Sequence, residues 1–356
     1  MSNVLRRVEE ATPEWLTSIL RRRGFLERGS VVAVRAASSS TLLVSNVSRL
    51  EVSYTPDASR DAPASLFLKL SLPVFQPEAV KDSSRMEVEF YSSVAPEMKD
   101  PPVPACFDAA FDPATNRAHL LLEDLSATHF QPPSPLPPSE THCAQAVEAL
   151  AEVHAHWWEH PRLGAGVGEF LTEDKVEAVA RNAAERFEKF ADSLGDGLPH
   201  ARRALYERVI ECFPAPWRRL SSAKGLTLTH GDAHTWNFMY PRAAGRTLLI
   251  DWQLWHPHVG PRDLAFMMTL YWDRERRSRL EEKLLRRYHE ALASRGVASY
   301  SWEQCLTDYR WAALRNIFVP VWQWAGGVPE PVWRPGVERA LLAFEDLRCA
   351  ELIEEG

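Results

Sequence analysis

Short runs of alternating apolar and polar side chains dominate the first 125 residues of the chain. In the run 47–54, Leu50, Val52 and Tyr54 alternate with polar neighbours, and the run 64–70 repeats the pattern. This period of two predicts half-buried antiparallel strands. Further strands are expected over the valine-rich run 31–36, near 104–111 and near 117–124.

Two helices are expected within this part. One begins after Thr12, a good N-cap residue followed by Pro13, and Gly24 can terminate it. The other covers about 77–94. The first 125 residues therefore predict a small antiparallel sheet with an inserted helix.

The pattern becomes helical after a proline-rich stretch at 131–138, which suits a linker or a loop that opens the next helix. From residue 139, five side chains fall on one face at three- and four-residue spacing: Cys143, Val147, Leu150, His154 and Trp157. Further helices are expected over roughly 173–192, 198–213, 262–271, 275–295, 301–318 and 335–353. Twelve of the 13 tryptophans lie after residue 150, which favours an aromatic-rich helical lobe. We therefore predict an α+β chain with a sheet lobe, residues 1–125, and a larger helical lobe, residues 126–356.

Residues 225–251 interrupt the helical pattern with two strand-like runs, 226–229 and 247–250. Between them lies the segment His230-Gly231-Asp232-Ala233-His234-Thr235-Trp236-Asn237. A hairpin formed by 238–240 and 247–250 would bring Asn237 beside Asp251. An amide oxygen and a carboxylate placed together make an oxygen site that suits Mg²⁺.

The spacing of three polar residues fits phosphoryl transfer. Kinase catalytic loops place an aspartate five residues before an asparagine, and a second metal-binding aspartate after the following hairpin. Asp232, Asn237 and Asp251 have this spacing. The chemistry requires Mg²⁺ on the phosphates and a group that orients the attacking hydroxyl.

These motifs resemble a known superfamily. The pattern H-G-D-x-H-x-x-N followed by I-D-W is similar to that of the aminoglycoside phosphotransferases and choline kinases, and most similar to the bacterial ecdysteroid-kinase-like branch. The resemblance runs from about Leu66 to Ala265 and includes L-L-L-E-D-L-S at 120–126, L-A-E-V-H-A-H-W-W at 150–158 and G-P-R-D-L-A at 260–265. It implies a protein-kinase-like two-lobed fold and an ATP-dependent, Mg²⁺-requiring phosphotransferase that acts on a small-molecule hydroxyl.

The resemblance also implies roles for individual residues. Asp232 becomes the catalytic aspartate, and Asn237 and Asp251 the Mg²⁺ ligands. Lys69 becomes the phosphate-binding lysine. Its partner is Glu87 in the motif E-x-x-F-Y, with Glu89 as the alternative.

Three further assignments follow from the same resemblance. Residues 122–125, with Glu123 and Leu125, become the hinge whose backbone meets adenine, and Asp263 braces the catalytic loop. The family's glycine-containing phosphate loop is missing, since no glycine occurs between Gly29 and Gly164. The candidate replacement is a loop at 37–41, in which Ser39 and Ser40 would reach phosphate.

Composition limits the classes of molecule that the protein is expected to bind. The 356 residues carry a formal net charge of −7, which argues against nucleic-acid binding. No apolar run is long enough to span a bilayer, the N-terminus lacks a signal-like apolar stretch, and the five cysteines are scattered without a CxxC pair. We expect a cytoplasmic protein without nucleic-acid or membrane partners. Both a monomer and a homodimer stay open.

Two questions of function stay open at this point. The acceptor is either a cationic, aminoglycoside-like molecule or an apolar or neutral alcohol, and the tryptophan-rich second lobe favours the latter. The missing glycines support an alternative reading as a non-catalytic nucleotide-binding regulatory protein. A protein kinase is disfavoured because I-D-W replaces D-F-G and no A-P-E-like segment is present.

Overall fold

The computed structural model describes residues 4–42, 45–72, 82–133, 137–212 and 214–354. The chain forms two compact units. Unit 1 contains Met1–Phe130 and Met239–Gln253, and unit 2 contains Gln131–Phe238 and Leu254–Gly356. The assignment of a nucleotide-binding role to residues 1–125 and a catalytic role to 126–356 stays a prediction.

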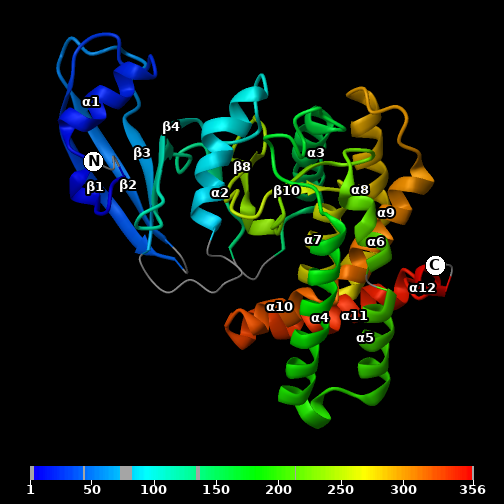
Figure 1. Ribbon diagram of the computed structural model, residues 1–356. Coiled ribbons are helices and arrows are strands. Elements are labelled where there is room, and N and C mark those ends of the chain that lie inside the picture. The colour runs from blue at the N-terminus through cyan, green and yellow to red at the C-terminus, as the bar shows by residue number, and fades with distance from the viewer. Residues whose placement is uncertain (1–3, 43–44, 73–81, 134–136, 213, 355–356) are drawn as a thin grey trace. The chain divides into compact units, whose positions relative to one another are not determined.

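A five-stranded antiparallel sheet forms the centre of unit 1, in the order β1-β2-β3-β5-β4 (Figure 1). Its strands are β1 (Val31–Thr41), β2 (Ser45–Tyr54), β3 (Ser65–Ser71), β4 (Cys106–Asp112) and β5 (Arg117–Glu123). Helix α1 (Pro13–Arg22) lies against one face of this sheet and buries Leu16, Ile19 and Leu20. Thr12 caps it, because its Oγ1 accepts the Trp15 N–H at 3.2 Å. The predicted strands and first helix are therefore present.

The expected loop at 37–41 is instead the end of β1. Ser39 pairs with Ser48 and Ser40 with Val47 in the ladder with β2. The Ser39 and Ser48 hydroxyls also lie 2.8 Å apart. The serine run contains no glycine or proline to end the strand, so backbone hydrogen bonding continues to Thr41. Strand β2 begins at Ser45, and residues 43 and 44 lie outside the described part.

The inserted helix α2 (Ser83–Glu89) packs against β4 and β5. It continues as a π-helical turn (Phe90–Val94) and a short 3₁₀ turn (Ala95–Glu97), and residues 77–81 of the expected helix lie outside the described part. The Phe90 ring stacks on Trp252, with ring centroids 3.9 Å apart. A second, three-stranded sheet has the order β6-β8-β9, from β6 (His129–Phe130), β8 (Phe238–Pro241) and β9 (Leu248–Leu249).

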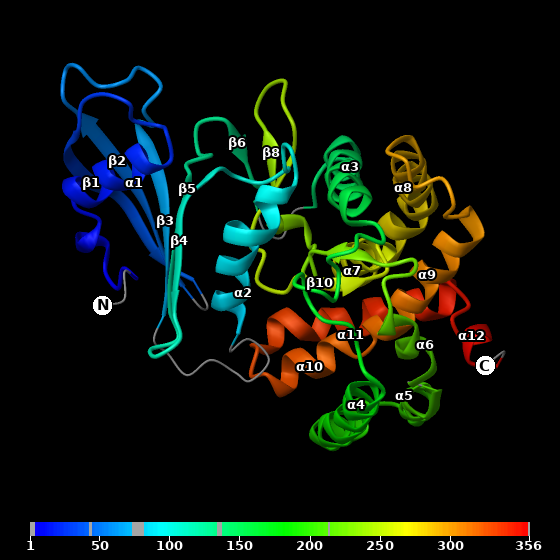
Figure 2. The same ribbon diagram turned by 45° about the horizontal axis from the view of Figure 1, so that its top comes forward.

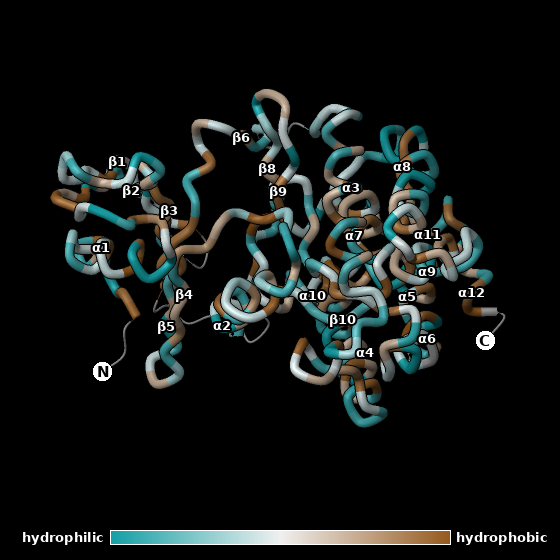
Figure 3. The backbone as a smooth tube through the Cα atoms, turned by 90° about the horizontal axis from the view of Figure 1, so that it is seen from above, coloured by the Kyte–Doolittle hydropathy of each residue, from teal (hydrophilic) through white to brown (hydrophobic). Residues whose placement is uncertain are grey.

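Unit 2 is helical around a central helix, α7 (Pro261–Tyr271), whose residues 261–270 are all buried. Helices α9 (Trp302–Asn316) and α11 (Glu330–Asp346) pack against α7, while α3 (Glu140–Trp157) packs against α8 (Arg274–Ser294), as Figure 2 shows. The others are α4 (Glu173–Leu194), α5 (His200–Cys212), α6 (Pro214–Arg218), α10 (Val319–Ala325) and α12 (Glu351–Glu354). A two-stranded ladder of β7 (Thr227–Thr229) and β10 (His256–His258) completes the unit. Figure 3 shows the contrast between the hydrophobic α7 and the more hydrophilic α8.

Two expected C-terminal helices have different limits. The helix expected over 301–318 ends at Asn316, and α10 follows with Pro320 in its first turn, where proline is tolerated. The helix expected over 335–353 begins earlier, at Glu330, and ends at Asp346. Arg348 then adopts a positive φ of 52°, which interrupts the helical conformation before α12.

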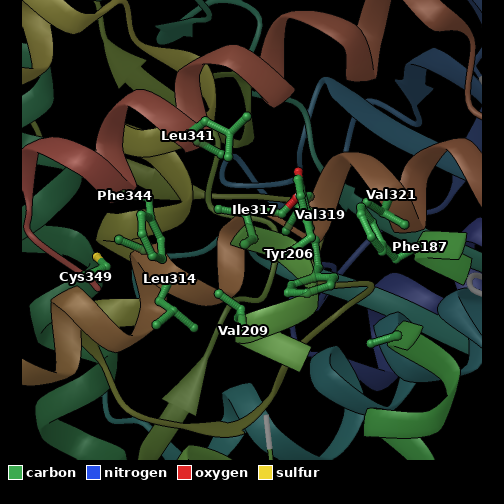
Figure 4. Close-up of a cluster of buried hydrophobic side chains, with 14 of the residues drawn as sticks. Phe187, Tyr206, Val209, Leu314, Ile317, Val319, Val321, Leu341, Phe344 and Cys349 are labelled. Carbon is green, nitrogen blue, oxygen red and sulfur yellow. The ribbon is translucent and has the colours of Figure 1, made fainter. Parts of the chain in front are cut away.

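The core of unit 2 gathers aromatic and aliphatic side chains from α4, α5, α9, α10 and α11 (Figure 4). Tyr206 lies fully buried within it, stacked on Phe187 at 4.5 Å between ring centroids. Its hydroxyl donates to the Ile317 carbonyl at 2.8 Å, so its polar end is satisfied. The predicted α+β class, with an antiparallel sheet part and a larger helical part, is confirmed. No helix in the described ranges combines the length and apolar character that crossing a bilayer requires.

Candidate active site

The loop after β7 depends on a glycine at its second position. Gly231 has a φ of +86°, and a Cβ built there would lie 2.0 Å from the Leu254 carbonyl oxygen. Both the conformation and the close backbone approach exclude a larger residue. The loop therefore turns sharply straight after β7 and presents Asp232.

A buried carboxylate, Asp263, holds the start of this loop. Its Oδ2 accepts the His230 N–H at 2.6 Å and its Oδ1 accepts the Gly231 N–H at 3.0 Å. His154 donates from Nε2 to Oδ2 at 3.2 Å and contacts the Tyr288 hydroxyl through Nδ1 at 2.8 Å. Asp263 thus occupies the bracing position that the resemblance implied, and His154 is a satisfied core histidine.

Neighbouring groups stabilise the negative charge of the buried Asp263. Burial on its own would raise the pKa of this carboxyl group. The hydrogen bond and charge of His154, together with Arg262 and His230, outweigh burial and hold the pKa far below its usual range. Asp263 is therefore ionised at neutral pH and a strong acceptor for the loop's N–H groups.

Asp232 and Asn237 lie together within unit 2. The Asn237 amide donates from Nδ2 to the Asp232 backbone carbonyl at 2.8 Å and to Oδ2 at 3.3 Å. This use of the NH₂ group leaves Oδ1 as the amide atom suited to a cation. The Asp232 side chain is 27% exposed, and His234 Nε2 lies 3.7 Å from its Oδ2. Asp232 is thus held in place and is also accessible to a substrate.

Aromatic rings stand beside this aspartate. His234 lies 5.2 Å from Tyr271 and 5.8 Å from Trp236, and Trp236 lies 6.0 Å from Tyr271, measured between ring centroids. Sequence reasoning did not identify Tyr271. No local spacing selects it, because the eight residues from Asp263 to Tyr271 leave the two side chains about 80° apart around the helix.

Unit 1 holds a separate charged group around Lys69. Lys69 Nζ lies 2.8 Å from Glu87 and 2.5 Å from Asp251, and Gln253 donates to Glu87 at 3.2 Å. Glu89 instead pairs with Arg85 at 3.0 Å, so Glu87 is the partner of Lys69. Burial opposes the charge of Lys69, but Asp251 and Glu87 more than offset it and raise the lysine pKa above its usual value. Sequence reasoning did not identify Gln253, two residues after Asp251.

The predicted hinge residues both take part in backbone hydrogen bonds of unit 1. The Glu123 N–H donates to the Ala105 carbonyl at 2.8 Å, and the Leu125 carbonyl accepts the His129 N–H at 2.8 Å. Their contact with adenine stays a prediction. Ser39 and Ser40 lie on a paired strand, as described above.

The two proposed metal ligands, Asn237 and Asp251, belong to different compact units, so their juxtaposition stays a prediction. Within the described residues, no group of three or more histidine, cysteine or acidic side chains is arranged to hold a metal ion. An Asn–Asp pair is still a sufficient protein contribution to Mg²⁺, which commonly takes its other ligands from water and substrate phosphates.

Comparison with solved structures gives matches over almost the full length of the chain. A Ralstonia eutropha JMP134 protein provisionally described as an aminoglycoside phosphotransferase has a TM-score of 0.56 at 13% identity, covering 94% of this chain and 98% of the other. The GDP complex of aminoglycoside 2′-phosphotransferase-IIIa has a TM-score of 0.52 at 14% identity, covering 95% and 99%. Choline kinase from Cryptosporidium parvum has a TM-score of 0.51 at 12% identity, covering 96% and 97%. At these identities the likeness establishes the fold alone.

Comparison at the level of sequence identifies one family rather than only a fold. A search of curated proteins found no significant match. The profile of the ecdysteroid kinase-like family matches residues 43–296, more than half of the chain, and includes every residue of both charged groups described above. The chain therefore belongs to the ecdysteroid kinase-like family.

Proposed function

We propose that this protein transfers the γ-phosphoryl group of ATP, with Mg²⁺, to a hydroxyl group of a small molecule. The family and the structural neighbours are small-molecule kinases. The observation that carries the proposal is the loop geometry. Asp232 is partly exposed on a loop whose first two N–H groups are fixed by a buried, ionised Asp263, and Asn237 contacts it directly.

In the proposed reaction the acceptor oxygen attacks the γ-phosphorus, and the bond from that phosphorus to the β–γ bridging oxygen breaks to release ADP. The Asp232 carboxylate orients the acceptor hydroxyl and receives its proton. The Lys69 cation, fixed by Glu87, would contact the ATP phosphates. Asn237 and Asp251 would hold Mg²⁺, which supplies charge neutralisation on the phosphates when bound.

For the acceptor we propose an apolar or neutral alcohol. The rings of His234, Trp236 and Tyr271 offer an aromatic surface, and His234 and Tyr271 both interact with Asp232. The positive charge of Arg262 acts on Asp232, and that of Arg339 acts on Tyr271. Arg262 and Arg339 therefore offset part of the negative charge that Asp232 and Asp263 would present to a cationic acceptor. The names aminoglycoside phosphotransferase and choline kinase therefore support the reaction type, not the acceptor.

The test is acceptor-dependent ADP release from MgATP, measured over a panel of hydroxyl compounds that includes aminoglycosides, choline and planar apolar alcohols. We expect turnover with an apolar or neutral alcohol and none above background with Asp232→Ala. Turnover confined to cationic acceptors would contradict the proposed acceptor class but support the proposed phosphoryl transfer. MgATP binding without turnover on a broad panel favours the regulatory alternative, and absence of MgATP binding removes the kinase proposal.

Replacing Lys69 with methionine should lower kcat/KM for MgATP by about 10²- to 10³-fold, because a positioned phosphate-binding cation is removed. Steady-state kinetics with varied MgATP measures this effect. Lys99→Met is the matched control, since Lys99 is an exposed lysine of the same unit. Equal kinetics for the two variants would show that Lys69 does not contact nucleotide.

A further inference from the structure

Arg315 on α9 is a cation whose buried nitrogen atoms lack an acceptor. Its Nε and Nη1 are buried, and neither meets a hydrogen-bond acceptor among the residues that the structure describes. No carboxylate in the described ranges pairs with it either. The guanidinium lies between two indole rings, 4.8 Å from the centroid of Trp217 and 4.9 Å from that of Trp322. Cation–π contacts stabilise the charge through its faces but leave the in-plane N–H donors unused.

An unsatisfied buried cation needs an explanation. Arginine keeps its proton in proteins, so the charged form must be accommodated. Burial disfavours this charge, and the nearby positive charge of Arg262 adds to the effect, so both lower the arginine pKa. In folded proteins, buried donors of this kind commonly bind an ion or an ordered water molecule.

A cavity adjoins the guanidinium. It measures about 60 Å³ and is lined by Arg315, His258, Trp217, Arg219 and Asp308, among others. A single water needs about 15 Å³ on the same measure, so the space suffices for an ion of chloride or bromide size. Arg315 as a residue is partly exposed, which gives an ion a route from solvent.

The other polar groups at this cavity also favour an anion. Asp308 is the acidic residue of its lining, and its charge is already paired with both terminal nitrogens of Arg219 and bonded by Tyr300 and Gln304. His258 Nδ1 accepts the Val259 N–H at 2.8 Å. A neutral His258 therefore carries its proton on Nε2, so a residue that lines the cavity has an N–H donor.

We propose that this cavity of unit 2 is an anion-binding site, in which Arg315, supported by His258, binds a small inorganic anion such as chloride. The anion would offset the repulsion between Arg315 and Arg262. Arg262 in turn contacts Asp263, Nη1 to Oδ1 at 3.4 Å, so occupancy stabilises the side chain that braces the catalytic loop. The site is distinct from the proposed phosphoryl-transfer residues and holds whether or not the protein is a kinase.

The first experiment replaces gluconate, too large for the cavity, by bromide at a constant ionic strength of about 0.1 M. We expect Tm to rise by about 2 °C when bromide is in tenfold excess over its Kd, and this rise to disappear in Arg315→Met. Arg310→Met is the matched control on the same helix, because Arg310 donates to the Leu347 and Arg348 carbonyls. It should lower Tm yet keep the bromide response.

The second experiment is a crystal structure of the wild-type protein grown in bromide, which decides the matter even if Arg315→Met fails to fold. An anomalous peak within hydrogen-bonding distance of Arg315 Nε or Nη1 supports the site. Density without anomalous signal there identifies water and overturns the proposal. An unchanged bromide response in a folded Arg315→Met variant overturns it too.

Discussion

Replacing Asp232 with asparagine is expected to lower kcat by about 10³-fold, while KM for MgATP stays within about threefold of wild type. Loss of a positioned general base typically removes 10²- to 10⁴-fold of rate. Asparagine keeps the shape of the side chain and its contact with Asn237 but cannot receive a proton. The measurement is steady-state kinetics with the best acceptor of the panel.

Two additional measurements make this result specific. Calorimetric titration with MgATP should give the wild-type affinity, which separates a catalytic defect from misfolding. Asp192→Asn is the control for a simple loss of negative charge, since Asp192 is 69% exposed on α4. A kcat for Asp232→Asn within tenfold of wild type would contradict the role of Asp232 as base.

Removing the buried carboxylate with Asp263→Ala is expected to lower the free energy of unfolding by about 3–5 kcal/mol, as measured by urea denaturation. The substitution leaves the His230 and Gly231 N–H groups and the His154 ring nitrogen without their acceptor, and buried donors without acceptors are strongly unfavourable. Asp192→Ala should change the same quantity by less than about 0.5 kcal/mol, as exposed substitutions usually do.

The acid dependence of stability provides a second measure of this aspartate. Because folding lowers the Asp263 pKa, its contribution is complete above the unfolded-state pKa of about 3.9 and declines as pH falls below it. The difference in unfolding free energy between wild type and Asp263→Ala should therefore be constant near neutral pH and shrink below about pH 4. Hydrogen exchange gives a local test. Unchanged protection of the His230 and Gly231 amides in the variant would show that Asp263 does not brace the loop.

Local patterns predicted much of the fold because they arise from neighbouring residues. The alternation in 47–54 and 64–70 marks β2 and β3, and Thr12-Pro13 marks the start of α1. The prediction of a loop at 37–41 was wrong, because this polar run pairs with β2 and extends β1 to Thr41. Pairing depends on a partner strand, which a local pattern does not contain.

The candidate site was less accessible to sequence reasoning, since its contacts join distant residues. His154 and Asp263 are 109 positions apart, and Lys69 and Asp251 are 182 apart. The motifs predicted the residue types and their order. Glu87 was preferred to Glu89 because Glu87 occupies the glutamate position of the family motif E-x-x-F-Y. The Tyr271 ring and the Gln253 amide, in contrast, became evident only from the folded chain.

The central position of α7 has a consequence for how acceptor preference can diverge. One helix carries the loop brace at its first turn and an aromatic neighbour of Asp232 at its last, and residues 261–270 between them are buried on every side. A mutation along α7 that reshapes the acceptor surface would also disturb packing and the catalytic loop. New acceptor preferences should therefore arise on elements beside α7, such as α10, whose Gln323 hydrogen-bonds Tyr271 and is itself partly exposed. Acceptor preference would then change through substitutions at the edge of the site, while substitutions in the central helix α7 would be selected against.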